Sequence, residues 1–95
     1  RDGSTALHAA CIKGHVEIAE FLLDTGASID KADNNGATAL MQAVRNNKPK
    51  SVKLLLERNA DTRVKATIGR WQGKTAADIA KSNELDTIAD LILPV

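Results

Sequence analysis

The chain has 95 residues, which suits a single domain, and 43% of them are hydrophobic. Fifteen are Ala and ten are Leu, against one Phe, one Trp and no Tyr, so a β-sandwich or barrel is excluded in favour of helices. The net charge of +1 excludes charge-driven disorder, and no apolar run approaches a membrane span. The single cysteine, Cys11, excludes a disulfide framework and predicts an intracellular location, cytoplasmic or nuclear.

The sequence repeats itself at offsets of 33 and then 37 residues. Gly3–Ala6 aligns with Gly36–Ala39, and that segment aligns with Gly73–Ala76. The apolar segment Phe21–Asp24 aligns in the same way with Leu54–Glu57. These offsets predict three units, at about 1–34, 35–68 and 69–95, with four additional residues between the second and the third.

Each unit is predicted to form two helices. In the first unit, the helices are expected over Ala6–Lys13 and Val16–Asp24, because Gly14 and Gly26 can end them in a left-handed conformation. The second of these helices would place Ile18, Ala19, Leu22 and Leu23 on one face.

The start signals recur from unit to unit. Thr5, Thr38 and Thr75 each precede a helical segment, and their hydroxyl groups can accept an otherwise unpaired backbone N–H. Pro49 suits the first turn of the second helix of unit two. Because one helical pair cannot bury its own apolar face, the units must stack to form a core.

These residues resemble the ankyrin repeat, whose pattern is roughly D-x-x-G-x-T-P-L-H-x-A-A-x-x-G-H followed by I-V-x-L-L-L and G-A-x-V-N. The matching segments are Gly3–His15, Ile18–Leu23 and Gly26–Asp30; the match is strong in unit one, fair in unit two and loose in unit three. The resemblance implies an all-α solenoid of about three helix-turn-helix repeats joined by β-turn finger loops. It also implies a non-enzymatic protein-interaction module.

The two ends of the chain differ. Unit three is rich in polar residues and is expected to act as a terminal cap, with Asp78, Lys81, Ser82, Asn83, Glu84, Asp86 and Asp90. Unit one has no such cap, so we expect at least one further unit before it in a longer protein, unless a short leading segment finishes this end.

Two sets of residues superficially suggest other chemistry. His8, Cys11 and His15 have a spacing that could bind zinc, but the resemblance implies that His8 braces the turns and that Cys11 lies in the core. The segment Gly69–Thr75 has one residue too few between its glycines for a phosphate-binding loop. We therefore predict no metal, no cofactor and no enzymatic activity.

Positive charge is concentrated in the middle of the chain. Residues 45–74 have nine basic and two acidic side chains, whereas the segments on either side each have a net charge of −3. The longer connection Thr62–Lys74 also carries Trp71 among basic residues, a composition typical of protein recognition. Alternatively, Trp71 folds back and covers the stack of units two and three.

By position in the ankyrin pattern, partners would lie along the finger tips and inner helices. The predicted partner-binding residues are Lys13, Asn34, Asn35, Met41, Arg45, Asn46, Lys65, Arg70, Trp71 and Lys74, and Ser4, Ile12, Ala37 and Asn83 occupy corresponding positions. Met41 could equally be a packing residue. The expected partner is a protein, acidic or mixed in charge, bound by a monomer. The alternatives are an anion-binding module for nucleic acid or acidic membrane lipid, and a structural spacer.

Overall fold

The computed structural model describes residues 6–33, 36–67, 71–83 and 85–92. Their helices are α1 (Ala6–Lys13), α2 (Val16–Asp24), α3 (Ala39–Arg45), α4 (Pro49–Glu57), α5 (Ala76–Ser82) and α6 (Asp86–Ile92). In this part of the chain, the only β-type pairing is an isolated bridge between Ala66 and Gln72. The all-α fold is confirmed, and so are the predicted bounds of the first two helices and the start of α4 at Pro49.

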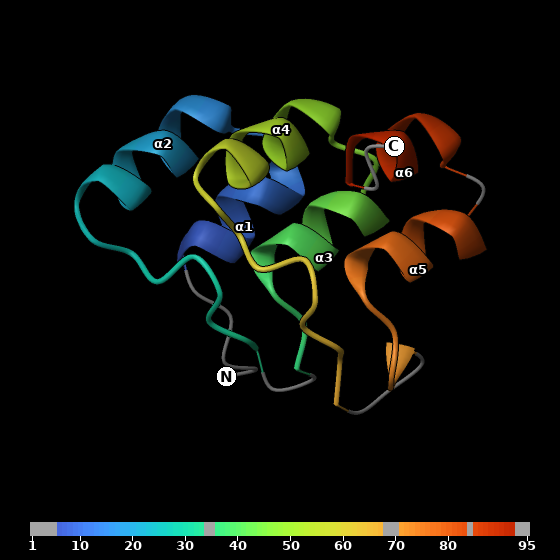
Figure 1. The fold of residues 1–95 in the computed structure, drawn as a ribbon. Coiled ribbons are helices and arrows are strands. Elements are labelled where there is room, and N and C mark those ends of the chain that lie inside the picture. Colours follow the sequence, from blue (N-terminus) through green and yellow to red (C-terminus); the bar gives the residue numbers. More distant parts are fainter. Residues whose placement is uncertain (1–5, 34–35, 68–70, 84, 93–95) are drawn as a thin grey trace.

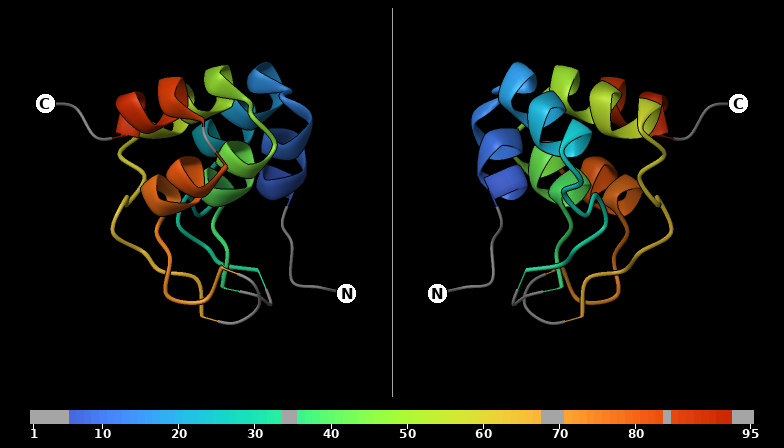
Figure 2. Two further views of the ribbon diagram at one scale, coloured as in Figure 1. Left: turned by 90° about the vertical axis from the view of Figure 1, so that its right-hand side faces the viewer. Right: turned by 90° about the vertical axis from the view of Figure 1, so that its left-hand side faces the viewer.

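The helices form two layers (Figure 1). The first helices of the three pairs, α1, α3 and α5, pack side by side, and α2, α4 and α6 form a second layer on top of them (Figure 2). The long connections between pairs extend away from both layers on the same side of the molecule. This is the predicted solenoid, in which each helical pair packs on its neighbour, with the third pair included.

Threonine caps fix where the inner helices begin. The Thr38 hydroxyl accepts the Met41 N–H at 3.3 Å, and the Thr75 hydroxyl accepts the Asp78 N–H at 3.2 Å. The Asp78 carboxylate in turn accepts the Thr75 N–H at 3.1 Å, which completes a capping box. Two of the three predicted caps are confirmed, and Thr5 lies outside the described residues.

The core consists mainly of small and aliphatic side chains. Leu7, Leu40 and Ile79 occupy it from the three inner helices, and buried Ala residues lie between them. The buried His8 ring donates from Nε2 to the Ala37 carbonyl oxygen at 2.9 Å. This bond joins the first repeat to the second finger and confirms that the imidazole braces the turns.

One predicted core residue is not in the core. Ala19 is buried, but 52% of Ile18 is exposed, so the prediction that both lie on one buried face is wrong for Ile18. The repeat offset aligns Ile18 with Ser51 and Ile88, which are buried in helices that pack on the outer helix of a preceding repeat. Among the described residues no helix covers α2 in that way, so Ile18 remains in solvent.

Candidate partner-binding surface

The third finger contains the additional residues. In the second finger, the Asp33 N–H donates to the Ala37 carbonyl at 2.9 Å, and the corresponding bond in the third finger runs from Ala66 to Lys74 at 3.0 Å. The bonded residues are four positions apart in the second finger and eight in the third. The four additional residues therefore lie between Ala66 and Lys74, within a closed loop that contains Trp71.

The loop returns toward the inner helices. Trp71 is partly buried at the edge of the core, and the guanidinium carbon of Arg45 lies 5.6 Å from the centroid of its ring. This separation is typical of a cation–π contact. The Lys74 ammonium group donates to the Ser82 hydroxyl at 3.2 Å, so both side chains connect the third finger to the last residues of inner helices. Trp71 therefore packs against the core, and the cationic side chain of Arg45 lies against its ring.

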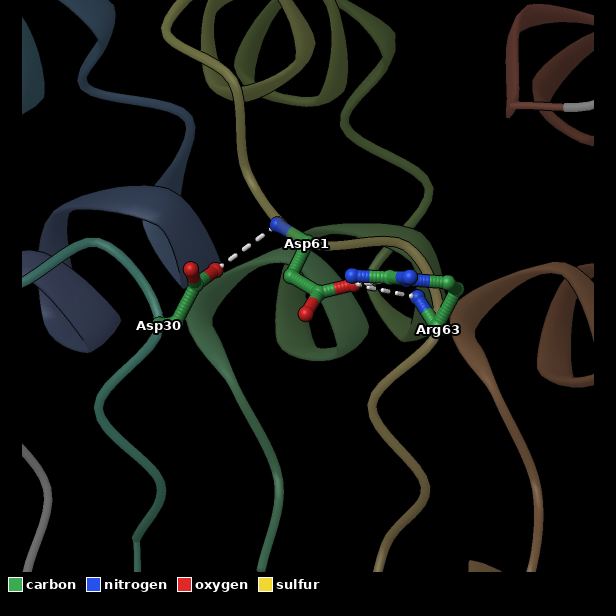
Figure 3. A network of polar contacts seen from close by, with 3 residues as sticks. All are labelled: Asp30, Asp61 and Arg63. Carbon is green, nitrogen blue, oxygen red and sulfur yellow. Dashed lines mark hydrogen bonds and ion pairs between the residues drawn. The ribbon is translucent and has the colours of Figure 1, made fainter.

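A second group of polar contacts links the segments that lead into the second and third fingers (Figure 3). The Asp30 carboxylate accepts the Asp61 N–H at 2.8 Å, and the Asp61 carboxylate accepts the Arg63 N–H at 2.8 Å and the Arg63 Nε–H at 3.2 Å. The backbone and side-chain hydrogen bonds from Arg63 lower the pKa of Asp61. On the outer layer, Arg58 forms an ion pair with Asp24. Two of the nine basic side chains in residues 45–74 are thus paired with carboxylates.

Most of the predicted site residues that the structure describes are accessible to solvent. Four of the predicted positions, Ser4, Asn34, Asn35 and Arg70, lie outside the described residues. The exposed ones are Lys13, Arg45, Lys65 and Asn83, and the partly buried ones are Ile12, Asn46, Trp71 and Lys74. The structure brings Arg45, Trp71 and Lys74 together around the base of the third finger, and Lys65 directly precedes Ala66, which is bonded to Lys74 there. We call these four residues the Trp71 surface.

Two predicted positions are buried and cannot contact a partner in this arrangement. Met41 is 1% exposed, and Ala37 is equally inaccessible. Met41 packs in the core because its helix contacts both neighbouring inner helices. Its inclusion as a partner-binding residue was wrong, and the packing interpretation is correct.

The residues that superficially resembled a metal site do not converge. The Nε2–H of His8 is bonded to a carbonyl, Cys11 is buried and His15 is exposed. Burial raises the pKa of the Cys11 thiol to about 11. The described residues contain no group of three or more His, Cys, Asp or Glu side chains that could hold a metal ion.

Two surface features of the fold were not predicted from the sequence. Phe21 is 64% exposed, whereas Leu54, which the repeat offset aligns with it, is buried. The offset could have identified Phe21 as a position that is buried only where a neighbouring repeat covers it. Lys13, Lys48 and Lys50, from two different repeats, line one hollow of about 280 Å³. Only the folded arrangement brings Lys13 to the other two, so no sequence pattern predicted this hollow.

No described helix is long and apolar enough to cross a membrane.

The repeats of this chain are similar to those of known proteins. The family model described as ankyrin repeats (3 copies) matches residues 1–66. The mouse ankyrin repeat and SAM domain-containing protein 6 is 38% identical over 88 residues, which are 90% of this chain and 10% of that protein.

Two other relatives extend this comparison. The human BCL-6 corepressor-like protein 1 is 33% identical over 94 residues, which are 94% of this chain and 5% of that protein. The potassium channel AKT1 of Oryza sativa subsp. indica is 60% identical over 38 residues, 40% of this chain and 4% of the channel. The chain thus spans a tenth or less of the length of these relatives.

Proposed function

Because the chain belongs to the ankyrin-repeat family, whose members are protein-interaction modules, we propose that it binds a protein partner along its fingers and inner helices, without enzymatic activity. The observation that carries this proposal is the Trp71 surface. Trp71 and Arg45 are residue types that dominate binding energy at protein interfaces. The contact between them joins the exposed Arg45 of α3 to the partly buried Trp71 of the third finger.

The charge of this surface favours an acidic partner. Among the described residues, the ion pairs are Arg58 with Asp24 and Arg63 with Asp61, so Arg45, Lys65 and Lys74 form none. Lys74 lies close enough to Asp78 to help lower the pKa of that carboxyl, so its charge is partly offset. Unpaired cations around an aromatic ring attract an acidic protein surface and accelerate the encounter with it. We also propose that the module acts as a monomer inside the cell, in the cytoplasm or nucleus. The free, buried thiol of Cys11 supports the intracellular location.

The test compares the chain with its Trp71→Ala, Arg45→Ala and Arg63→Ala variants in partner capture, followed by affinity measurement on the captured protein. Arg63→Ala is the matched control, because that arginine already pairs with Asp61. Trp71→Ala should weaken binding by about 2 kcal/mol or more. Unchanged affinity per folded molecule for Trp71→Ala and Arg45→Ala would contradict the proposal, and circular dichroism would establish the folded fraction.

Binding of nucleic acid is the less favoured alternative. Base stacking requires an open aromatic face, whereas the ring of Trp71 is partly buried and has Arg45 against it. The salt dependence separates the two functions. Affinity for a polyanion should fall steeply and linearly with the logarithm of salt concentration, while a Trp-anchored protein contact should weaken modestly.

A further inference from the structure

A hollow of about 280 Å³ lies at the start of α4, between two repeats. It is lined by Lys13 and Gly14 at the end of α1 and by Lys48, Pro49, Lys50 and Ser51 at the start of α4. We call it the α4 hollow. The Trp71 surface, in contrast, is built by the second and third repeats.

The first turn of α4 offers uncapped backbone donors. This helix has nine residues, its N-cap is Lys48, whose side chain cannot accept a hydrogen bond, and no acidic residue lies in its first turn. Pro49 has no N–H, and the first intrahelical bond runs from the Val52 N–H to the Lys48 carbonyl at 3.0 Å. The N–H groups of Lys50 and Ser51 therefore have no acceptor within the helix.

Three other helices have either a side-chain cap or a negative charge at this end. Thr38 and Thr75 cap α3 and α5 with their hydroxyls, and Glu17 places a carboxylate in the first turn of α2. A negative charge at a helix N-terminus is favourable because the backbone dipoles leave partial positive charge there. In α4, no side chain of the first turn supplies that negative charge.

Ser51 provides an independent indication of a ligand. Its residue is 0% exposed, it lines the α4 hollow, and its hydroxyl has no hydrogen-bond partner among the described residues. The equivalent positions in the other two repeats are Ile18 and Ile88, so a hydroxyl is not required for packing there. A buried hydroxyl without a partner is unfavourable, and an acceptor bound in the hollow would satisfy it.

The side chains around the hollow add positive charge. No described carboxylate forms an ion pair with Lys13, Lys48 or Lys50. The stem of Lys48 passes close to Gly14, with its Cδ 3.2 Å from the place that a Cβ on Gly14 would take. Glu17 lies in the adjoining hollow, of which Lys50 also forms part, and is the acidic side chain that opposes this charge.

We propose that the α4 hollow binds a phosphate group, held by the Lys50 and Ser51 N–H groups, the Ser51 hydroxyl and the three lysine ammonium groups. A helix N-terminus is suited to this ligand, because its N–H groups point toward the bound anion. Phosphate is favoured over a carboxylate because these donors are more numerous than two oxygens can satisfy. The site is separate from the proposed protein-binding function.

The experiment is a titration of the ¹⁵N-labelled 95-residue chain with inorganic phosphate, at constant ionic strength and pH. A second titration uses phosphoserine, and a third uses acetate. Saturable shifts at the Lys50 and Ser51 amides are expected with phosphate, with phosphoserine, or with both. The comparison between these two tells whether the site prefers the free anion or a phosphorylated ligand. Equal binding of acetate would overturn the assignment to phosphate.

Variants distinguish the site from general attraction to lysines. Lys50→Gln together with Lys13→Gln should weaken binding by about tenfold or more. Lys53→Gln is the matched control, an exposed lysine of α4 that does not line the hollow, and should leave the affinity unchanged. Shifts that do not saturate, or an equal loss in Lys53→Gln, would overturn the proposal.

Ser51→Ala tests the buried hydroxyl itself. Removing an unpartnered hydroxyl should leave the chain folded, and the binding model predicts that it weakens phosphate binding about threefold or more. Unchanged phosphate affinity in a folded Ser51→Ala variant would show that the hydroxyl is a packing feature. That result would overturn the site as drawn, whatever the outcome for the Trp71 surface.

Discussion

Phe21 of α2 and Leu54 of α4 occupy the same position in two successive repeats, yet Phe21 is 64% exposed and Leu54 only 5%. The difference follows from stacking, because α4 packs on α2 while no described helix packs on the other side of α2. Together with Ile18, Phe21 forms an uncovered apolar face of the kind that the second and third repeats bury. The expectation of a further unit before the first one stays a prediction, and this face is where it would pack.

The Phe21 and Leu54 positions should differ in their contribution to stability. Leu54→Ala removes buried methyl groups from the contact between repeats and should lower the free energy of unfolding by about 2–4 kcal/mol. Phe21→Ala should cost less than about 1 kcal/mol, because the side chain is already in solvent. Urea denaturation of the two variants measures both values. Equal losses would mean that another element covers α2 in solution.

Gly36 should tolerate substitution less well than Gly73. Both have positive φ, +75° and +80°, so Ala at either position incurs a similar conformational cost of about 1 kcal/mol or more. A Cβ on Gly36 would lie 2.5 Å from the backbone nitrogen of Thr67 in the next finger, whereas a Cβ on Gly73 meets nothing within 4 Å. Gly36→Ala should therefore have the lower melting temperature, by calorimetry. Identical melting temperatures would show that the two fingers are not in close contact.

The repeat pattern predicted the helices because their signals are local. Pro49, the threonine caps and Gly14 act within one turn, and the threonine recurs at the same position in all three units. The offset could also have identified Asn47, which aligns with Gly14 and has a φ of +54°. Asn tolerates this left-handed conformation.

The surface was harder to predict than the helices. Whether Ile18 is buried depends on a neighbouring repeat, and whether Met41 is accessible depends on packing from both sides. The basic side chains of residues 45–74 form one cluster in the sequence, but the fold distributes them over separate parts of the surface. Arg58 and Arg63 pair with carboxylates, Lys48 and Lys50 line the α4 hollow, and Arg45 contacts Trp71. The contacts of Arg58 with Asp24 and of Arg45 with Trp71 join residues far apart in the sequence, which spacing along the chain does not encode.

The capping box of α5 should contribute measurably to stability. Thr75→Ala removes the hydroxyl that accepts the Asp78 N–H and should cost about 1 kcal/mol in urea denaturation. The Thr75 backbone N–H lowers the pKa of Asp78 below its ordinary value of 3.8. A lowered carboxyl pKa contributes stability above the unfolded value, and that contribution is lost as the pH falls through the folded pKa.

Acid denaturation of the Asp78→Asn variant therefore tests the other half of the box. The variant should lose less stability than the parent chain as the pH falls below about 4, because it has no carboxylate to protonate. Parallel pH profiles for the two chains would mean that the Asp78 carboxylate does not prefer its charged form in the folded state.

Cys11 should make the chain less stable at alkaline pH. Burial raises its pKa from 9.0 to about 11, so between these values the unfolded chain has lost the thiol proton while the folded chain retains it. Stability must then fall as the pH rises above about 9, by about 1 kcal/mol at about pH 10. Val44 occupies the equivalent buried position of the second repeat, so Cys11→Val is the matched control. Urea denaturation at about pH 8 and about pH 10 should show a smaller loss in this variant, since it keeps every other titrating group. An equal loss in both chains would assign the alkaline destabilisation to the lysines instead.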